Sequence, residues 1–125
     1  SNITTNQTLL ALGGLVYLTW LGPQGLRDVG ETCLSLAAYA KQRLQERSGL
    51  ELLFPGQATF KEFAVRVGRN AHDVVRDARE RGVHPGYALG RDYPGMDDVL
   101  LVAVTEKRTP DEIDRLADVL AEVAR

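Results

Sequence analysis

Apolar residues are concentrated near the start of the chain, in residues 8–21. They fall on all sides of a predicted helix, and such a helix is normally buried on all sides. The segment is shorter than the roughly 20 apolar residues that a membrane span needs. Gly13 and Gly14 destabilise a helix, which indicates that another backbone approaches closely there. Gly22 and Pro23 predict the end of this helix and the start of a second one.

Three further helices are predicted from apolar residues that recur every three or four positions. The first covers residues 24–47. The next covers residues 70–81, with Asn70 as the expected N-cap and Gly82 as the expected stop. The last begins after Thr109, where Thr-Pro-Asp-Glu forms a capping box with proline at the first helical position.

Four short segments have the pattern of strands. They cover residues 50–54, 59–67, 87–89 and 99–104. In the second segment apolar and polar side chains alternate, which predicts one buried face. The last segment is a continuous apolar run, typical of a strand that is covered on both faces.

The elements therefore follow the order α-α-β-β-α-β-β-α. This order predicts an α+β fold in which helices pack on a small, mainly antiparallel sheet. A chain of 125 residues is the size of one domain, residues 1–125. It begins with Ser1 and lacks the layout of a signal peptide, so we expect a fragment of a longer chain.

Composition and charge narrow the function classes. The chain has 44% hydrophobic and 26% charged residues, as globular proteins do. With 17 acidic and 15 basic side chains, the formal net charge is -2, which gives no electrostatic reason to expect nucleic acid or an anionic membrane as a partner. Cys33 is the one cysteine, so no internal disulfide can form and we expect a cytoplasmic location.

Reactive groups with the spacing of a catalytic or metal site are not found in the sequence. His72 and His84 lie near the ends of one helix, without further ligands at metal-binding spacing. Cys33 lies on the apolar stripe of the second helix and is predicted to be buried rather than nucleophilic. The glycines between residues 82 and 95 precede a strand, so they indicate turns rather than a phosphate-binding loop.

The three lysines give no sign of a cofactor site. Lys41, Lys61 and Lys107 lie on a predicted helix surface, in a strand and just outside a helix, respectively. A lysine that forms an imine with a cofactor must be desolvated in a pocket. We therefore predict no catalytic, metal-binding or cofactor-binding residue in this chain.

One charged loop is a candidate site. Arg91 and Asp92 lie in a segment fixed by glycine and proline, after a predicted strand. Arg91 could bind a carboxylate or a partner surface, because a guanidinium holds a planar anion at two points. Alternatively, an ion pair of Arg91 with Asp92 or Glu106 fixes the loop, and this second interpretation is favoured.

Several segments resemble the C-terminal part of the glycine decarboxylase P-protein, an enzyme that uses pyridoxal phosphate and has fold type I. The most specific segments are Gly-Tyr-Ala-Leu-Gly-Arg-Asp-Tyr-Pro at 86–94 and Thr-Glu-Lys-Arg-Thr at 105–109. Residues 1–7, 17–27 and 51–54 are also similar. The pattern resembles subunit 1, the alpha chain of the split enzyme, rather than the subunit that carries the cofactor lysine.

This resemblance implies a function. The parent enzyme would decarboxylate glycine on pyridoxal phosphate and pass the aminomethyl group to the lipoyl arm of the H-protein. Subunit 2, the beta chain, would form an alpha-beta heterotetramer with subunit 1 and hold the cofactor. The fragment itself would be structural and inactive alone, and we expect it to expose an apolar face that the rest of the parent covers.

The resemblance also implies candidate residues at the N-terminus. Asn2, Thr4 and Asn6 match a motif at the junction of the two domains and could point toward a cleft. Thr4 departs from the family pattern, where cysteine is expected. Ser1 and Asn2 could instead be the remnant of a tag.

Two other functions are compatible with parts of the sequence. A free-standing regulatory module that binds a small metabolite would have the same fold class, and an amino acid would then raise its melting temperature. A nucleic-acid binder would use the arginines of residues 70–81. Acidic residues alternate with those arginines, so a solvated helix face is favoured.

Overall fold

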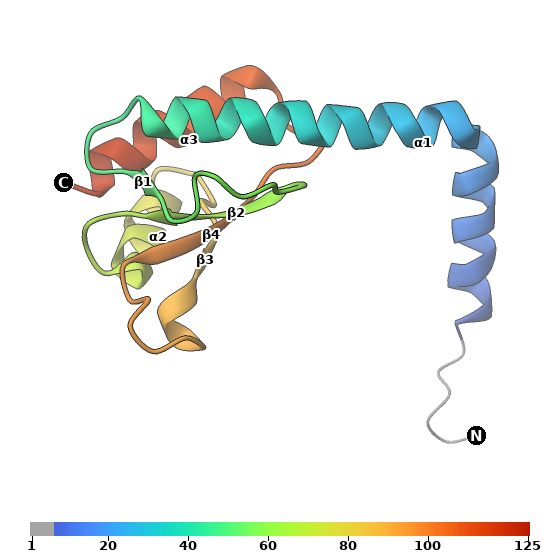
Figure 1. The fold of residues 1–125 in the computed structure, drawn as a ribbon. Helices are drawn as coiled ribbons and strands as arrows, with labels where there is room; N and C mark the ends of the chain where they lie inside the picture. Colours follow the sequence, from blue (N-terminus) through green and yellow to red (C-terminus); the bar gives the residue numbers. More distant parts are fainter. Residues whose placement is uncertain (1–6) are drawn as a thin grey trace. The chain divides into compact units, whose positions relative to one another are not determined.

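The computed structural model describes residues 7–125, which divide between Glu31 and Thr32 into two compact units. Helix α1 (Thr8–Gln45) begins in the first unit and ends in the second (Figure 1). At Gly22 the backbone has φ 63° and ψ -177°, so two helices meet at a kink just before Pro23. The predicted helix boundary is therefore confirmed at Gly22, although the two predicted helices form one element.

Residues 8–20 leave their apolar side chains exposed. Leu9 is 78% exposed and Trp20 is 85% exposed. The expectation that this helix is buried on all sides is therefore wrong for the described chain, and the expected exposed apolar face is present. By length and composition alone α1 could cross a membrane, a test that core helices of globular proteins also pass.

The second unit contains a four-stranded antiparallel sheet (Figure 1). Its order is β1-β2-β4-β3. The strands are β1 (Glu51–Leu52), β2 (Glu62–Arg66), β3 (Tyr87–Ala88) and β4 (Val99–Ala103). Each lies inside its predicted segment, so the predicted α+β class and antiparallel sheet are confirmed.

Helices cover one face of this sheet. The second half of α1, α2 (Ala71–Glu80) and α3 (Pro110–Val123) contribute to the same hydrophobic core as the sheet. Val65, Leu100 and Leu120 are completely buried in it. Both predicted N-caps form: Asn70 accepts a hydrogen bond from the His72 backbone N–H, and Thr109 forms a reciprocal capping box with Glu112.

The observed burial of strand β4 differs from the predicted burial. Leu100 and Val102 are buried in the core, whereas Leu101 is half-buried and Ala103 is exposed. Val99, on the same side as Leu101, is buried. The prediction that the strand is covered on both faces is thus confirmed at Val99, holds in part at Leu101 and is wrong at Ala103.

Candidate functional site

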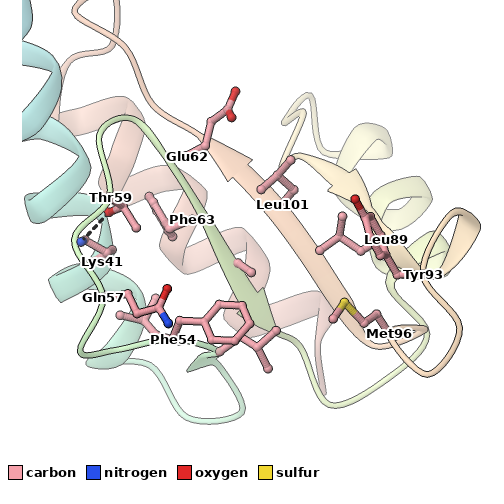
Figure 2. Close-up of a pocket in the computed structure, with 13 residues that line it drawn as sticks. Lys41, Phe54, Gln57, Thr59, Glu62, Phe63, Leu89, Tyr93, Met96 and Leu101 are labelled. Atoms are coloured by element: carbon pink, nitrogen blue, oxygen red, sulfur yellow. Dashed lines mark hydrogen bonds between the residues drawn. The ribbon is translucent and has the colours of Figure 1, made fainter.

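A groove of about 380 Å³ lies on the sheet face opposite the core (Figure 2). Its floor contains Ala64 of β2 and Leu101 of β4, which are partners in the strand register. Phe54, in the loop after β1, lines one side. Tyr93 and Met96, in the loop after the 3-10 turn η1 (Leu89–Arg91), line the other side. The small side chain of Ala64 leaves the space that defines this apolar groove.

Polar groups line the groove mainly at one end. Lys41 Nζ donates a hydrogen bond to Thr59 Oγ1 at 2.8 Å, and Gln57 lies nearby, whereas Glu62 lies apart from them at the start of β2 (Figure 2). Among the described residues, every buried side-chain nitrogen or oxygen has a hydrogen-bond partner. Of the described residues that line the groove, Lys41 and Glu62 are charged, and the floor at Ala64 and Leu101 is apolar.

The candidate loop residues Arg91 and Asp92 are held by a common neighbour. Tyr87 Oη donates to Asp92 Oδ2 at 2.7 Å, and the guanidinium carbon of Arg91 lies 5.7 Å from the centre of the Tyr87 ring. All three side chains are exposed. The structure brings Arg91 and Asp92 together through Tyr87, and no ion pair joins Arg91 to either predicted partner within residues 7–125.

Glu106 lies at the other end of the sheet from this loop. Because β3 and β4 are antiparallel, the loop that carries Arg91 runs back toward the start of β4, whereas Glu106 follows its end. A Cβ on Gly90 would lie 2.7 Å from Asp97 Cα, which places the loop beside that end. Glu106 instead accepts a hydrogen bond from Cys33 Sγ at 3.4 Å, and Cys33 is buried as predicted.

Replacing Asp92 with asparagine tests the anchoring of this loop. The hydrogen bond to the Asp92 carboxylate raises the pKa of the Tyr87 phenol above its ordinary value. We expect Asp92→Asn to lower the pKa of Tyr87 toward that value and to speed amide exchange in residues 89–93. NMR titration of the tyrosine ring signals measures the first effect. An unchanged Tyr87 pKa would show that this contact does not form in solution.

Asn2, Thr4 and Asn6, the other predicted site residues, lie outside the described residues. Their expected position at a cleft between domains stays a prediction. On α2 the sequence predicted that acidic residues alternate with the arginines, and Arg76 indeed pairs with both Asp73 and Asp77. That pairing removes free positive charge from the helix face and counts against nucleic-acid binding.

An ionic network joins α1 to α3. Asp114 accepts hydrogen bonds from Tyr39 Oη at 2.8 Å and from Arg43 Nε at 2.6 Å. Arg47, two residues after the end of α1, pairs with Asp118, one turn further along α3, at 2.6 Å. The bonds from Arg43 and Tyr39 hold the pKa of the Asp114 carboxyl below its ordinary value.

This network predicts a specific loss of stability in acid. A carboxyl whose pKa is lower in the folded state stabilises the fold above its ordinary pKa, and this stabilisation is lost as the pH falls through the lowered value. We expect Asp114→Asn to be less stable than wild type near neutral pH, with the difference shrinking below the ordinary pKa of aspartate. Urea unfolding at a series of pH values measures it. Glu80→Gln is the control, because Glu80 forms no ion pair with any described residue; an equal pH dependence in both variants would contradict the prediction.

Comparison with known proteins identifies the family. The family model described as "Glycine cleavage system P-protein" matches residues 1–120. This chain belongs to the glycine cleavage system P-protein family. The resemblance inferred from residues 86–94 and 105–109 is therefore confirmed.

Relatives in this P-protein family are considerably longer than the chain. The "Probable glycine dehydrogenase (decarboxylating) subunit 1" of Nitratidesulfovibrio vulgaris is 48% identical over 121 residues, which cover 96% of this chain and 27% of the relative. That of Methylococcus capsulatus is 42% identical over 123 residues, with 98% and 27% covered. The chain thus spans about 27% of the length of these relatives.

A solved P-protein has the same fold. A crystal structure titled "glycine decarboxylase (P-protein) of the glycine cleavage system, in inhibitor-bound form" matches with a TM-score of 0.87 and 36% sequence identity. The match covers 98% of this chain and 28% of that one. The likeness therefore extends to nearly every described element.

The three lysines of this chain all lie in the part that the structure describes. Lys41 lies at the polar end of the groove, bonded to Thr59. Lys61 is exposed, 6.0 Å from the centre of the Phe60 ring, and Lys107 is exposed after β4. None of them is enclosed as an imine-forming lysine must be. The part of the chain that the structure describes also has no cluster of three or more possible metal ligands.

Sequence reasoning missed the groove. Its floor residues, Ala64 and Leu101, were assigned to two separate strands. The sequence did not indicate that these strands pair and that the two side chains share one face of the sheet. A signal was present: β4 is apolar at consecutive positions, and a strand with one face in water should alternate. That run alone would have indicated a second apolar surface on the sheet.

Proposed function

We propose that this chain is the C-terminal domain of subunit 1 of a glycine decarboxylase P-protein, and that it completes that subunit without catalytic groups of its own. The observation that carries the proposal is the family match over residues 1–120, supported by a solved P-protein with a TM-score of 0.87. The parent would decarboxylate glycine and transfer the aminomethyl group to the lipoyl arm of the H-protein. Its location would be cytoplasmic.

Pyridoxal phosphate, in this proposal, is held outside the chain. The support is the environment of the three lysines, since each is either hydrogen-bonded at the edge of a groove or exposed. Subunit 2, the beta chain, would hold the cofactor in an alpha-beta heterotetramer. This chain would contribute packing surfaces to subunit 1, and no nucleic acid or membrane would take part.

Cofactor titration and carbon dioxide release test the proposal. We expect the 125-residue chain to develop no visible absorbance of lysine-bound pyridoxal phosphate and to release no labelled carbon dioxide from carboxyl-labelled glycine. Full-length subunit 1 mixed with subunit 2 and H-protein should do both. Absorbance or turnover by the chain alone would overturn the proposal.

Lysine variants of the complete enzyme sharpen this test. Lys41→Arg, Lys61→Arg and Lys107→Arg keep the charge but cannot form the imine. We expect the assembled enzyme with all three changes to keep its cofactor absorbance. Loss of that absorbance, with the fold preserved by circular dichroism, would place the cofactor lysine in this chain. A metabolite-binding module would instead show a higher melting temperature with amino acids, a result we do not expect because the groove floor has no converging polar groups.

A further inference from the structure

The sheet face that carries the groove is apolar at its centre, although Glu62 and Arg66 lie on the same face at the two ends of β2. Ala64, Leu101 and Ala103 point away from the helix-covered core, at the centre of the sheet. An antiparallel sheet with one face in water normally has polar residues at such positions. The sequence of β4, Val-Leu-Leu-Val-Ala, suits a strand with both faces covered, but the described helices cover one. No described helix therefore packs on the second face of the sheet.

Residues around the groove have the composition of a protein interface. Phe54 is 52% exposed and Tyr93 is 56% exposed, on opposite sides of the groove. Met96 lies beside Tyr93, and Arg91 lies over the exposed ring of Tyr87. Aromatic residues, methionine and arginine are enriched in interfaces, and a contiguous exposed apolar patch marks a contact site. This surface is thus suited to contact a polypeptide.

The chemistry of the groove disfavours a polar metabolite. A pocket for a small polar molecule needs a few fixed polar groups that converge on it. Here Lys41 is already bonded to Thr59, and the floor is formed by the aliphatic side chains of Ala64 and Leu101. An apolar side chain entering above Ala64 would fill the space without leaving a polar group unpaired.

The length of the relatives indicates what packs on this second face of the sheet. They are more than three times its length, since it spans about 27% of them, and the additional residues belong to the same polypeptide. Covalent connection gives such a segment a high effective concentration at the groove, which a separate partner lacks. We propose that an apolar segment of the remaining part of the P-protein subunit 1 polypeptide packs into this groove, with a side chain above Ala64. This inference rests on the proposed function.

Thiol labelling of the full-length subunit tests the proposal. Gln57→Cys places a thiol at the edge of the groove, at a position that is exposed in this chain. Glu80→Cys is the matched control, an exposed position on α2, on the helix side of the sheet. Labelling is followed peptide by peptide, and native Cys33 is buried. We expect the thiol at position 57 to react at least about tenfold more slowly than that at position 80 in the native subunit, and at the same rate in urea.

The outcomes separate the possible occupants. Equal rates in the native full-length subunit would overturn the proposal. So would protection that disappears on dilution, which indicates a second copy, or protection that requires added subunit 2. Glycine decarboxylation by the same preparations, with subunit 2 and H-protein, is measured in parallel. Normal turnover with rapid labelling contradicts this inference alone, whereas slow labelling without turnover contradicts the proposed function alone.

Discussion

Gly86→Ala is expected to destabilise this domain by about 3 kcal/mol or more, because it combines a steric clash with backbone strain. Gly86 begins the turn into β3 with φ 141°, a conformation that side-chain-bearing residues rarely adopt. A Cβ there would lie 2.2 Å from the carbonyl oxygen of Leu101, far inside van der Waals contact. Because Leu101 is in the central strand, the sheet cannot move away without losing the β3–β4 pairing.

Two glycine variants serve as matched controls for Gly86→Ala. Gly95 also has a positive φ, 85°, but its Cβ would meet open space, so Gly95→Ala measures backbone strain alone, about 1 kcal/mol. Gly56→Ala has neither problem and should be within about 0.5 kcal/mol of wild type. Urea unfolding gives the free energies, and the melting temperature of Gly86→Ala should fall by roughly 10–20 °C. A Gly86→Ala variant as stable as Gly95→Ala would show that the close approach to Leu101 relaxes at little cost.

Local signals in the sequence were sufficient to predict the positions of most helices and strands. Asn70 and the Thr109–Glu112 capping box fixed the starts of α2 and α3, since an N-cap depends on residues within one turn. Gly22 marked the kink in α1 because it adopts a positive φ. The strands were located but predicted too long, as hydrogen-bonded pairing with a partner strand decides where a strand ends.

Contacts between residues that are far apart in the sequence could not be predicted from such local signals. Whether Arg91 could reach Glu106, one of its two expected partners, depended on which strands pair, and the antiparallel pairing of β3 with β4 places the two residues at opposite ends. The apolar run of β4 predicted two covered faces, but a pattern within one strand does not say whether the cover belongs to this chain.

Neighbouring leucines in β4 should therefore respond very differently to truncation. Leu100 is completely buried in the core, so we expect Leu100→Ala to cost about 2–5 kcal/mol of the free energy of unfolding. Leu101 points to the groove and is half-buried, so Leu101→Ala in the 125-residue chain should cost less than about 1 kcal/mol. The two variants remove the same atoms from adjacent positions of one strand, so strand propensity is the same in both. Urea unfolding of the two variants beside wild type gives the comparison.

The same pair of variants in the full-length subunit distinguishes a solvated sheet face from a covered one. If a segment of the subunit 1 polypeptide fills the groove, Leu101 becomes a core residue, and the cost of Leu101→Ala should rise toward that of Leu100→Ala. The cost of Leu100→Ala should stay the same, because its neighbours lie within this chain. A small cost for Leu101→Ala in both lengths of protein would mean that β4 keeps its apolar outer face in water. Hydrophobic burial on that side would then contribute nothing to joining this domain to the rest of its parent.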